Sequence, residues 1–220
     1  MRINNGGPSV SLDSIVLFPF DDQSIPFQSG VKLTLQGKQG GHGNEPVVTL
    51  GEPGAHDSEW IAFYGTVLRI NDELWMWYLG QGSDEHWHQR VCLAKSRDGR
   101  NWEKPDLGLV EYHGSKHNNL VDMGEDIHVQ ACVIFYEPED PDPDRRFKMS
   151  YETRKHSGLC AAYSADGLSW QESPNNPVGG WIEMAGGTKL DGCYYLAGQG
   201  GKHSVGVRQL VSVASYDFEH

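Results

Sequence analysis

The chain has 220 residues and a formal net charge of -12, from 30 acidic and 18 basic side chains. This negative balance disfavours nucleic acids and anionic membrane surfaces as partners, and it suits a neutral ligand such as a sugar. No apolar run approaches the length of a membrane-spanning helix, and the N-terminus lacks the apolar core of a signal peptide. We therefore expect a cytoplasmic protein with no nucleic-acid and no membrane partner.

The first 55 residues are predicted to be largely irregular. The short apolar runs at residues 14–18 and 31–35 have the composition of strands. Residues 37–54 are rich in glycine and proline, which is typical of a loop.

Three successive units of strand-like runs follow this segment, and none of them has the period of an amphipathic helix. The predicted strands of the three units are 61–68, 74–78, 89–96 and 109–112; 129–136, 147–151 and 157–164; and 187–190, 193–197 and 207–215. Tight turns at Asn71-Asp72 and Asp191-Gly192 join the first two strands in the first and third units. The pattern predicts consecutive antiparallel meanders.

A turn motif recurs at the end of the third strand of each unit. The segment 96–102, SRDGRNW, returns as 164–170, SADGLSW, and a degenerate copy begins at Ser215. In such a turn the aspartate can accept hydrogen bonds from backbone amides, and the glycine supplies a positive φ. Repetition of one supersecondary unit at this spacing indicates a repeat architecture, and the units have the size of propeller blades.

The predicted fold is therefore an all-β propeller with about three four-stranded antiparallel blades, at residues 56–124, 125–180 and 181–220. Propellers typically carry about four to eight blades, so we expect this chain to be the N-terminal portion of a longer propeller whose remaining blades follow. Residues 1–55 form a separate segment that could supply a ring-closing strand. The four cysteines show no Cys-x-x-Cys pair, which favours buried thiols over disulfides.

Residues 89–121 resemble the five-bladed propeller proteins related to glycoside hydrolase families 32 and 43. The resemblance is carried by the turn motif at 96–102, by EKPDLGL at 103–109 and by NNLV at 118–121, and it extends over about residues 56–220. It implies a five-bladed ring in the full-length protein and a carbohydrate substrate. It also implies hydrolysis of a glycosidic bond by carboxylates in a funnel on the propeller axis.

In these families each of the first three blades contributes one carboxylate from its innermost strand. Glu183 is the candidate acid, because it precedes Lys189 and the Gly192-x-Tyr-Tyr-Leu sequence as in family 43, although Met-Ala replaces Gly-Pro after it. Asp57 is the candidate base or nucleophile of the first blade, with Glu59 as the alternative. Asp126 is the candidate orienting carboxylate of the second blade. The family's usual proline is missing beside Asp57 and Asp126.

The same resemblance suggests side chains that bind the substrate next to these carboxylates. The substrate-binding candidates are Glu59, Trp60, His128 and Lys189.

A metal site is the less favoured interpretation of the ten histidines. His86 and His88, or His56 beside Asp57, could bind a cation, but their spacing is not that of a structural zinc site. We expect no cofactor, with a structural or axial cation such as calcium as the alternative. Because a fold does not determine function and the acid motifs are degenerate, a non-catalytic carbohydrate-binding or scaffolding propeller remains the alternative to a glycosidase.

Overall fold

The computed structural model describes residues 2–3, 10–11, 29–30, 46–83, 86–200 and 208–220. The chain divides into two units, Met1–Gly43 and Asn44–His220, and each is described here by itself. In the first unit β1 (Arg2–Ile3) pairs with β2 (Val10–Ser11) in antiparallel register. The strands predicted at 14–18 and 31–35 lie outside the described residues. No helix in the described ranges has the length and apolarity needed to cross a membrane.

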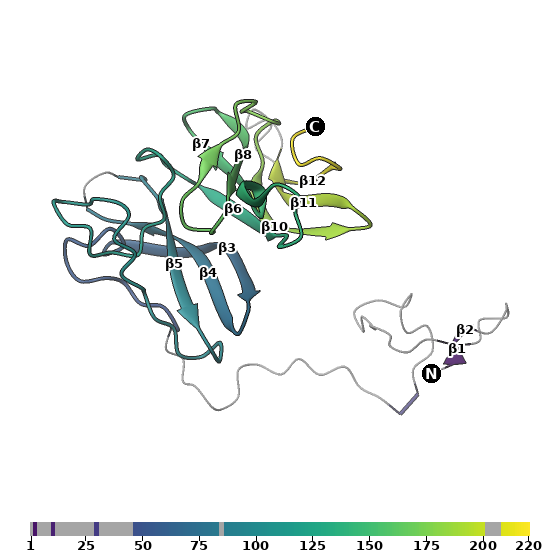
Figure 1. Ribbon diagram of the computed structural model, residues 1–220, viewed down its shortest axis with the longest axis horizontal. Coiled ribbons are helices and arrows are strands. Elements are labelled where there is room, and N and C mark those ends of the chain that lie inside the picture. Colours follow the sequence, from purple (N-terminus) through teal and green to yellow (C-terminus); the bar gives the residue numbers. More distant parts are fainter. Residues whose placement is uncertain (1, 4–9, 12–28, 31–45, 84–85, 201–207) are drawn as a thin grey trace. The chain divides into compact units, whose positions relative to one another are not determined.

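The second unit is built from three antiparallel sheets (Figure 1). Their strands are β3 (Trp60–Ile70), β4 (Glu73–Gln81) and β5 (Arg90–Ser96); β6 (Ala131–Tyr136), β7 (Phe147–Thr153), β8 (Gly158–Ser164) and β9 (Gln171–Glu172); and β10 (Glu183–Leu190), β11 (Cys193–Gly200) and β12 (Gln209–Ser215). A single turn of 3-10 helix, η1 (Pro143–Arg145), interrupts the described strands between β6 and β7. The predicted all-β class and antiparallel order are confirmed.

The unit Asn44–His220 begins upstream of the predicted boundary at residue 56. Residues before β3 pack onto the first sheet: the amide of Gly51 bonds the carbonyl of Asp57, and Val48 packs against the apolar cluster of Met76 and Tyr78. The segment 46–55 therefore belongs with the first sheet.

The sheets contain three, four and three strands, so the expectation of about four in each is met only by the second. The predicted fourth strand at 109–112 is wrong. The backbone turns before and after it, with positive φ values of 66° at Gly108, 50° at His113 and 80° at Gly114. The outer edge of β5 is instead met by isolated bridges from Glu103 and Leu120.

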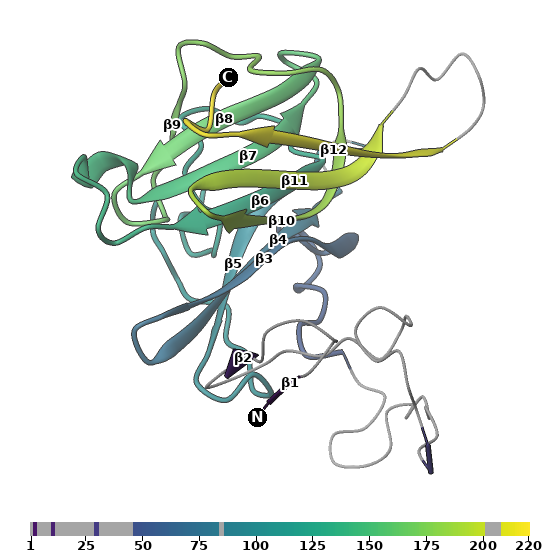
Figure 2. The same cartoon turned by 90° about the vertical axis from the view of Figure 1, so that its right-hand side faces the viewer.

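The first strands of the three sheets, β3, β6 and β10, contact one another. The amide of Ile134 in β6 donates a hydrogen bond of 2.9 Å to the Thr66 hydroxyl in β3. One apolar cluster fills the space between the first two sheets and another the space between the last two, where Figure 2 shows the third sheet packed against the second. Because the first strands meet and the later strands spread outward, the sheets are arranged as propeller blades.

The starting ends of β3, β6 and β10 lie on one side of this unit. Arg90 pairs with Gly80 beside the start of β3, and its guanidinium binds Asp126 just before β6. Glu152 lies opposite the first residue of β6 and accepts a hydrogen bond from Trp181, just before β10. One contact therefore joins the starting ends of β3 and β6, and another joins those of β6 and β10.

The repeated turn has the same hydrogen bonds in all three sheets. In the second copy, Ser164 Oγ accepts the amides of Asp166 and Gly167 at 3.2 and 2.9 Å. The carboxylate of Asp166 accepts the amides of Leu168 and Ser169 at 2.8 and 2.9 Å. The copies that begin at Ser96 and Ser215 repeat these contacts, so the motif is a structural turn that ends the third strand of each sheet.

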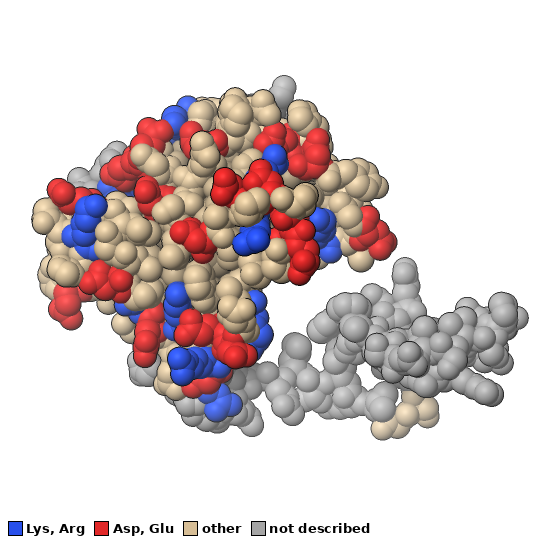
Figure 3. All heavy atoms as spheres, in the orientation of Figure 1, with Lys and Arg blue, Asp and Glu red and all other residues tan. Residues whose placement is uncertain are grey.

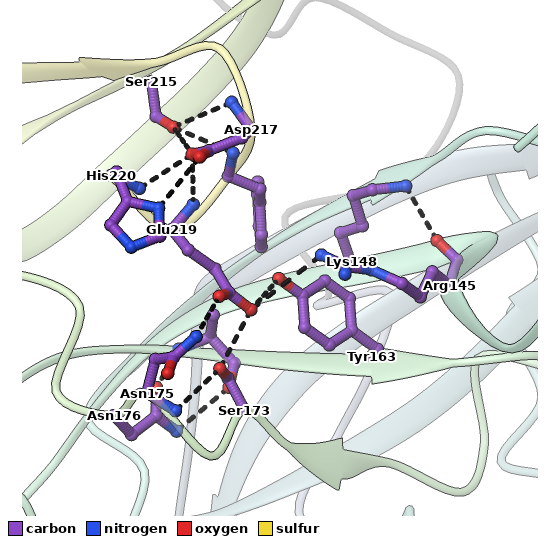
Figure 4. A network of polar contacts seen from close by, with 12 residues as sticks. Arg145, Lys148, Tyr163, Ser173, Asn175, Asn176, Ser215, Asp217, Glu219 and His220 are labelled. Atoms are coloured by element: carbon purple, nitrogen blue, oxygen red, sulfur yellow. Dashed lines mark hydrogen bonds and ion pairs between the residues drawn. The ribbon is translucent and has the colours of Figure 1, made fainter. Parts of the chain in front are cut away.

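The third copy attaches residues 215–220 to the second sheet. Phe218 takes the position of the glycine and has a φ of 77°, which is unfavourable for a side chain with a Cβ. Its buried ring packs against Tyr163 and Tyr194. Next to it, Glu219 accepts hydrogen bonds from the hydroxyls of Tyr163 and Ser173 (Figure 4). These contacts hold the unfavourable backbone conformation.

Replacing Asp166 by alanine should destabilise the folded chain by about 1–2 kcal/mol, because two amides lose a charged acceptor but can turn to water. Asp166→Asn keeps an acceptor oxygen and should recover part of this loss. The measurement is the free energy of unfolding in denaturant, with Glu139→Ala at the exposed tip before β7 as the control. An equal loss in Asp166→Ala and Glu139→Ala would show that the turn contributes nothing.

Candidate functional site

Polar side chains gather where the chain enters β6 and β10, together with the end of β7. We call this group the starting-end cluster, and its members are His88, Arg90, Asp126, His128, Glu152, Trp181 and Glu183. Asp126 and His128 come from the loop before β6, and Trp181 and Glu183 from the entry to β10. The cluster forms because the first strands of the sheets converge.

Asp126 is held as an ion by two cationic or polar neighbours. Arg90 Nε and Nη2 donate to its two carboxylate oxygens at 2.7 and 2.8 Å, and His88 Nε2 lies 3.0 Å from Oδ1. The hydrogen bond from Arg90 lowers the pKa of Asp126 below its usual value, although partial burial opposes this. Its side chain is 59% exposed. The carboxylate is therefore charged, oriented and open to a ligand.

His128 is buried and neutral. Its Nδ1 accepts a hydrogen bond of 3.2 Å from the amide of Gln89, and its ring lies edge-on to that of His88. Burial lowers the pKa of His128 to about 4, and the positive charge of Arg154 lowers it further in the same direction. Trp60, the first residue of β3, is half-buried against the core between the first two sheets. Their roles in substrate binding stay predictions.

Glu152 is the acidic member of the cluster that the sequence analysis missed, together with Arg90 and Trp181. The residue is only 6% exposed; Oε1 accepts a hydrogen bond from the Trp181 indole N–H, and Oε2 has no partner among the described residues. Burial raises the pKa of Glu152 to about 7, the bond from Trp181 opposes this, and the charge of Glu183 adds to it. The pKa values of Glu152 and Asp126 are therefore shifted in opposite directions.

A sequence signal for Glu152 does exist. Lys148, Ser150 and Glu152 alternate along β7, a strand that is buried along its whole length. Side chains at every second position of a strand point to the same face, so these three polar side chains form one row inside the protein. Buried polar groups need hydrogen-bond or ion-pair partners. Of the three, Lys148 finds its partners in Glu137 and Asp140.

Glu183 opens β10, pairs with Gln199 across the sheet and is half-buried, and its charge raises the pKa of Glu152. Lys189 lies towards the other end of the same strand, where its Nζ binds the Glu137 carboxylate and the Tyr194 hydroxyl. A strand rises about 3.3 Å per residue, so Lys189 is on the order of 20 Å from Glu183. The structure does not bring Lys189 into the starting-end cluster, because its spacing from Glu183 runs along an extended strand.

Asp57 lies on the face of the first sheet that is turned away from the second. Its side chain is 1% exposed, with Lys104 Nζ at 2.6 Å and the Tyr78 hydroxyl at 2.8 Å from Oδ2. A Cβ at Gly80 would come within 2.6 Å of the Asp57 Cβ, so the glycine makes room for this carboxylate. Asp57 is therefore enclosed and paired with Lys104, and its role as base or nucleophile stays a prediction.

Glu59, the alternative to Asp57, is exposed at the entry to β3. Its amide donates to the Gln81 carbonyl at 3.0 Å, which fixes the backbone there. Of the two candidates in the first sheet, Glu59 is the one that a ligand can reach.

No group of three or more His, Cys, Asp or Glu side chains in the described part of the chain is arranged to hold a metal ion. The four cysteines are buried free thiols. Figure 3 shows acidic side chains spread over the face drawn, with basic ones scattered among them.

No known family model matches the chain, and no curated protein matches its sequence. Among solved structures it is similar to the family 32 β-fructofuranosidase of Bombyx mori, with 12% identity and a TM-score of 0.48 over 72% of this chain and 32% of that one. A variant of that enzyme in complex with sucrose aligns with 16% identity and a TM-score of 0.42, over 70% and 34% of the two chains. A thermostable family 43 glycoside hydrolase aligns with 16% identity and a TM-score of 0.43, over 70% and 48%.

This chain spans less than half of the length of each of these proteins. Its structural neighbours thus include members of glycoside hydrolase families 32 and 43, the families that its sequence resembles, and the likeness is one of fold.

Stability should depend on pH through Glu152. A glutamate in an unfolded chain has a pKa of about 4.3, so the folded state, with its pKa near 7, binds the proton more tightly. The contribution of Glu152 to the free energy of unfolding is therefore largest at pH values below its pKa in the unfolded chain. It decreases as the pH rises from that value to its pKa in the folded chain. Glu152→Gln should remove a fall on the order of a few kcal/mol between those two pKa values, measured by denaturant unfolding at each pH.

His56 and His128 act in the opposite sense in part of this range, because burial lowers the pKa of each imidazole. Both are present in the wild type and in Glu152→Gln, so the difference between the two proteins isolates Glu152. A constant difference across the range would mean that Glu152 titrates normally in the folded chain. Glu139→Gln serves as the exposed control.

Proposed function

We propose that this chain is part of a glycoside hydrolase that cleaves glycosidic bonds with the carboxylates of the starting-end cluster. The observation that carries the proposal is the chemical difference between them. Arg90 lowers the pKa of Asp126, whereas burial raises the pKa of Glu152 to about 7, and Glu183 at the start of β10 is half-buried. Carboxyl groups whose environments separate their pKa values can divide acid and base roles.

In the proposed reaction Glu183 is the general acid that protonates the leaving oxygen. Asp126, fixed by Arg90, orients the sugar through its exposed oxygens. The base or nucleophile comes from the first sheet, where Glu59 is exposed and Asp57 is enclosed. Exposure therefore favours Glu59 for this role.

The proposed substrate is a carbohydrate, and the part of the site in hand is suited to bind one. The half-buried indoles of Trp60 and Trp181 offer apolar ring faces, and the carboxylate of Asp126 offers acceptors for hydroxyl groups.

The proposed chemistry uses only side chains, so we propose no cofactor; calcium remains the cation to test by chelation. We place the protein in the cytoplasm on its sequence.

A non-catalytic carbohydrate-binding or scaffolding propeller is the second candidate. It is favoured by the state of Asp57, whose carboxylate is neutralised by Lys104 inside the first sheet. A site without an available base could still bind a sugar through Asp126 and the indoles.

The variant Glu183→Gln in the full-length protein tests the proposal. The amide keeps the shape but cannot donate a proton, so cleavage of natural glycans should fall by about 10²- to 10⁴-fold while glycan binding persists. Substrates with an activated leaving group should lose much less, because their leaving oxygen needs little protonation. The measurements are kcat/KM on both substrate types and calorimetric binding.

Glu139→Gln, at the exposed tip between β6 and β7, is the matched control and should retain wild-type kinetics. If Glu183→Gln cleaves natural glycans at the wild-type rate, Glu183 is not the general acid. A wild type that binds glycans without cleaving any would establish the binding propeller instead.

A further inference from the structure

We infer that a hollow beside β5 is a binding subsite for one neutral sugar ring of the substrate, with Asp126 as its hydrogen-bond acceptor. The hollow has a volume of about 260 Å³, and its walls are the segments 109–111 and 120–127 together with Arg90 and Val91. It lies to the side of the predicted axial funnel, because β5 is the strand of the first sheet farthest from β3. The inference rests on the proposed function, because it takes the substrate to be a carbohydrate.

The hollow exists because the predicted fourth strand of the first sheet does not form. Gly108 and Gly114 turn the backbone at its two ends, with positive φ values of 66° and 80°. Residues 118–121 lie along the edge of β5 in its place, where the amide of Val121 donates to the carbonyl of Val91 at 3.1 Å. The turned segment is therefore a wall of the hollow and not a strand of the sheet.

Arg90 connects the two walls of the hollow. Its guanidinium donates to the carboxylate of Asp126 at 2.7 and 2.8 Å, and it lies over the ring of Tyr112 at 5.1 Å from the ring centroid. Tyr112 directly follows the segment 109–111, and Asp126 belongs to the loop on the other side. Arg90 is only 7% exposed, so these contacts hold the polar part of the hollow in place from inside the protein.

Asp126 is the oriented acceptor in the hollow. Its Oδ1 accepts from Arg90 Nε and lies 3.0 Å from His88 Nε2, whereas its Oδ2 accepts from Arg90 Nη2 alone among the described residues. A carboxylate oxygen can accept two hydrogen bonds, and this side chain is 59% exposed. Oδ2 can therefore accept one sugar hydroxyl, in a direction that the paired bonds from Arg90 determine.

The remaining walls suit the C–H face of a sugar ring. Leu109 and Val110 are half-buried in one wall, and Met123 and Ile127 are buried in the other. Sites for small molecules are mostly apolar with a few placed polar groups, and those for drug-sized ligands have about 300–1,000 Å³. A hollow slightly below this range has room for one ring and not for an extended chain.

The charges around the hollow favour a neutral ring over an anionic one. Among the described residues that line it, four are acidic: Glu111, Asp122, Glu125 and Asp126. Arg90 pairs with Asp126, and Lys155, from outside the hollow, pairs with Glu125. These two cations offset only part of the negative charge. The carboxylate of a uronic acid would be repelled here, whereas a neutral sugar would not.

The first test measures sugar binding to the full-length protein by saturation-transfer NMR titration. The probes are glucose, galactose, mannose, fructose and xylose, with glucuronate and galacturonate as charged counterparts. At least one neutral sugar should bind, and the uronates should bind more weakly. Val110→Trp places an indole in the hollow and should abolish this binding. Val47→Trp, at an exposed valine outside the hollow, is the matched control and should leave the Kd unchanged.

Binding of a neutral sugar that survives Val110→Trp would overturn the inference, and so would the absence of binding by every neutral probe. The melting temperature of Val110→Trp, compared with that of the wild type, shows whether the variant is folded.

The second test uses the exposed rim, where a substitution does not disturb packing. Glu111→Lys replaces a negative by a positive charge and should shift the ratio of Kd values for glucuronate and glucose by about three- to tenfold in favour of glucuronate. The shift should shrink at high salt. Glu139→Lys, at the exposed tip between β6 and β7, is the control and should leave the ratio unchanged. An unchanged ratio in Glu111→Lys would show that the sugar lies elsewhere.

The tests also distinguish the subsite from the function on which it rests. If neutral sugars bind in the hollow and the wild type cleaves no glycan, the subsite stands and the glycosidase is refuted. If natural glycans are cleaved through Glu183 while Val110→Trp changes neither sugar binding nor kcat/KM, the glycosidase stands and the subsite is refuted.

Discussion

The close approach of β3, β6 and β10 is the constraint on which the rest of the second unit depends. Strands that meet at their backbones need small residues at the contact, and Gly187 is one: a Cβ there would lie 2.9 Å from Val133 in β6 and 2.8 Å from the Tyr195 carbonyl. Within the first sheet, a Cβ at Gly65 would meet the carbonyl of Trp77 in β4, at the bulge between Ala62 and Thr66. Because these strands converge, the loops before them deliver their side chains to one place.

Burial then differentiates the candidate acidic residues of the second unit. Asp126 stays at the surface with a bidentate partner in Arg90, so its charge is stabilised. Glu152 goes into the interface between two sheets with one weakly polar partner, so its neutral form is favoured. Asp57 is buried with a full positive charge from Lys104. The carboxyl group is thus oriented by a cation, raised in pKa by burial or neutralised by a cation according to its position.

The turns explain how a chain with few helices holds its blades in register. Each Ser-x-Asp turn closes a third strand with four backbone hydrogen bonds to two side chains, at the end of β5, β8 and β12. The turn of the second sheet also contacts the first sheet, because the Trp77 indole donates a hydrogen bond of 3.0 Å to the Gly167 carbonyl. The repeated motif therefore links sheets as well as ending strands.

The sequence by itself determined the all-β class, the order of the three meanders and the repeated turns. These features rest on local patterns: alternating or continuous apolar runs, Asn-Asp and Asp-Gly turns, and a serine and aspartate that bond their own neighbours. It also named Asp126 and Glu183 as candidates; the first lies in the loop before β6 and the second opens β10. The failed fourth strand at 109–112 shows the limit of composition, because Gly108 and His113-Gly114 turn the backbone at both ends.

Only the tertiary structure decided which acids are open, buried or paired. Asp57 and Lys104 are far apart in sequence, as are Glu152 and Trp181, and their contacts come from the packing of one segment onto another sheet. Lys189 lies far from Glu183 because the strand between them is extended, and Glu152 lies near the start of β10 because Trp181 bonds to it. The protonation state of a carboxyl depends on solvent access and on neighbouring charges, and both are set by long-range packing that no local pattern encodes.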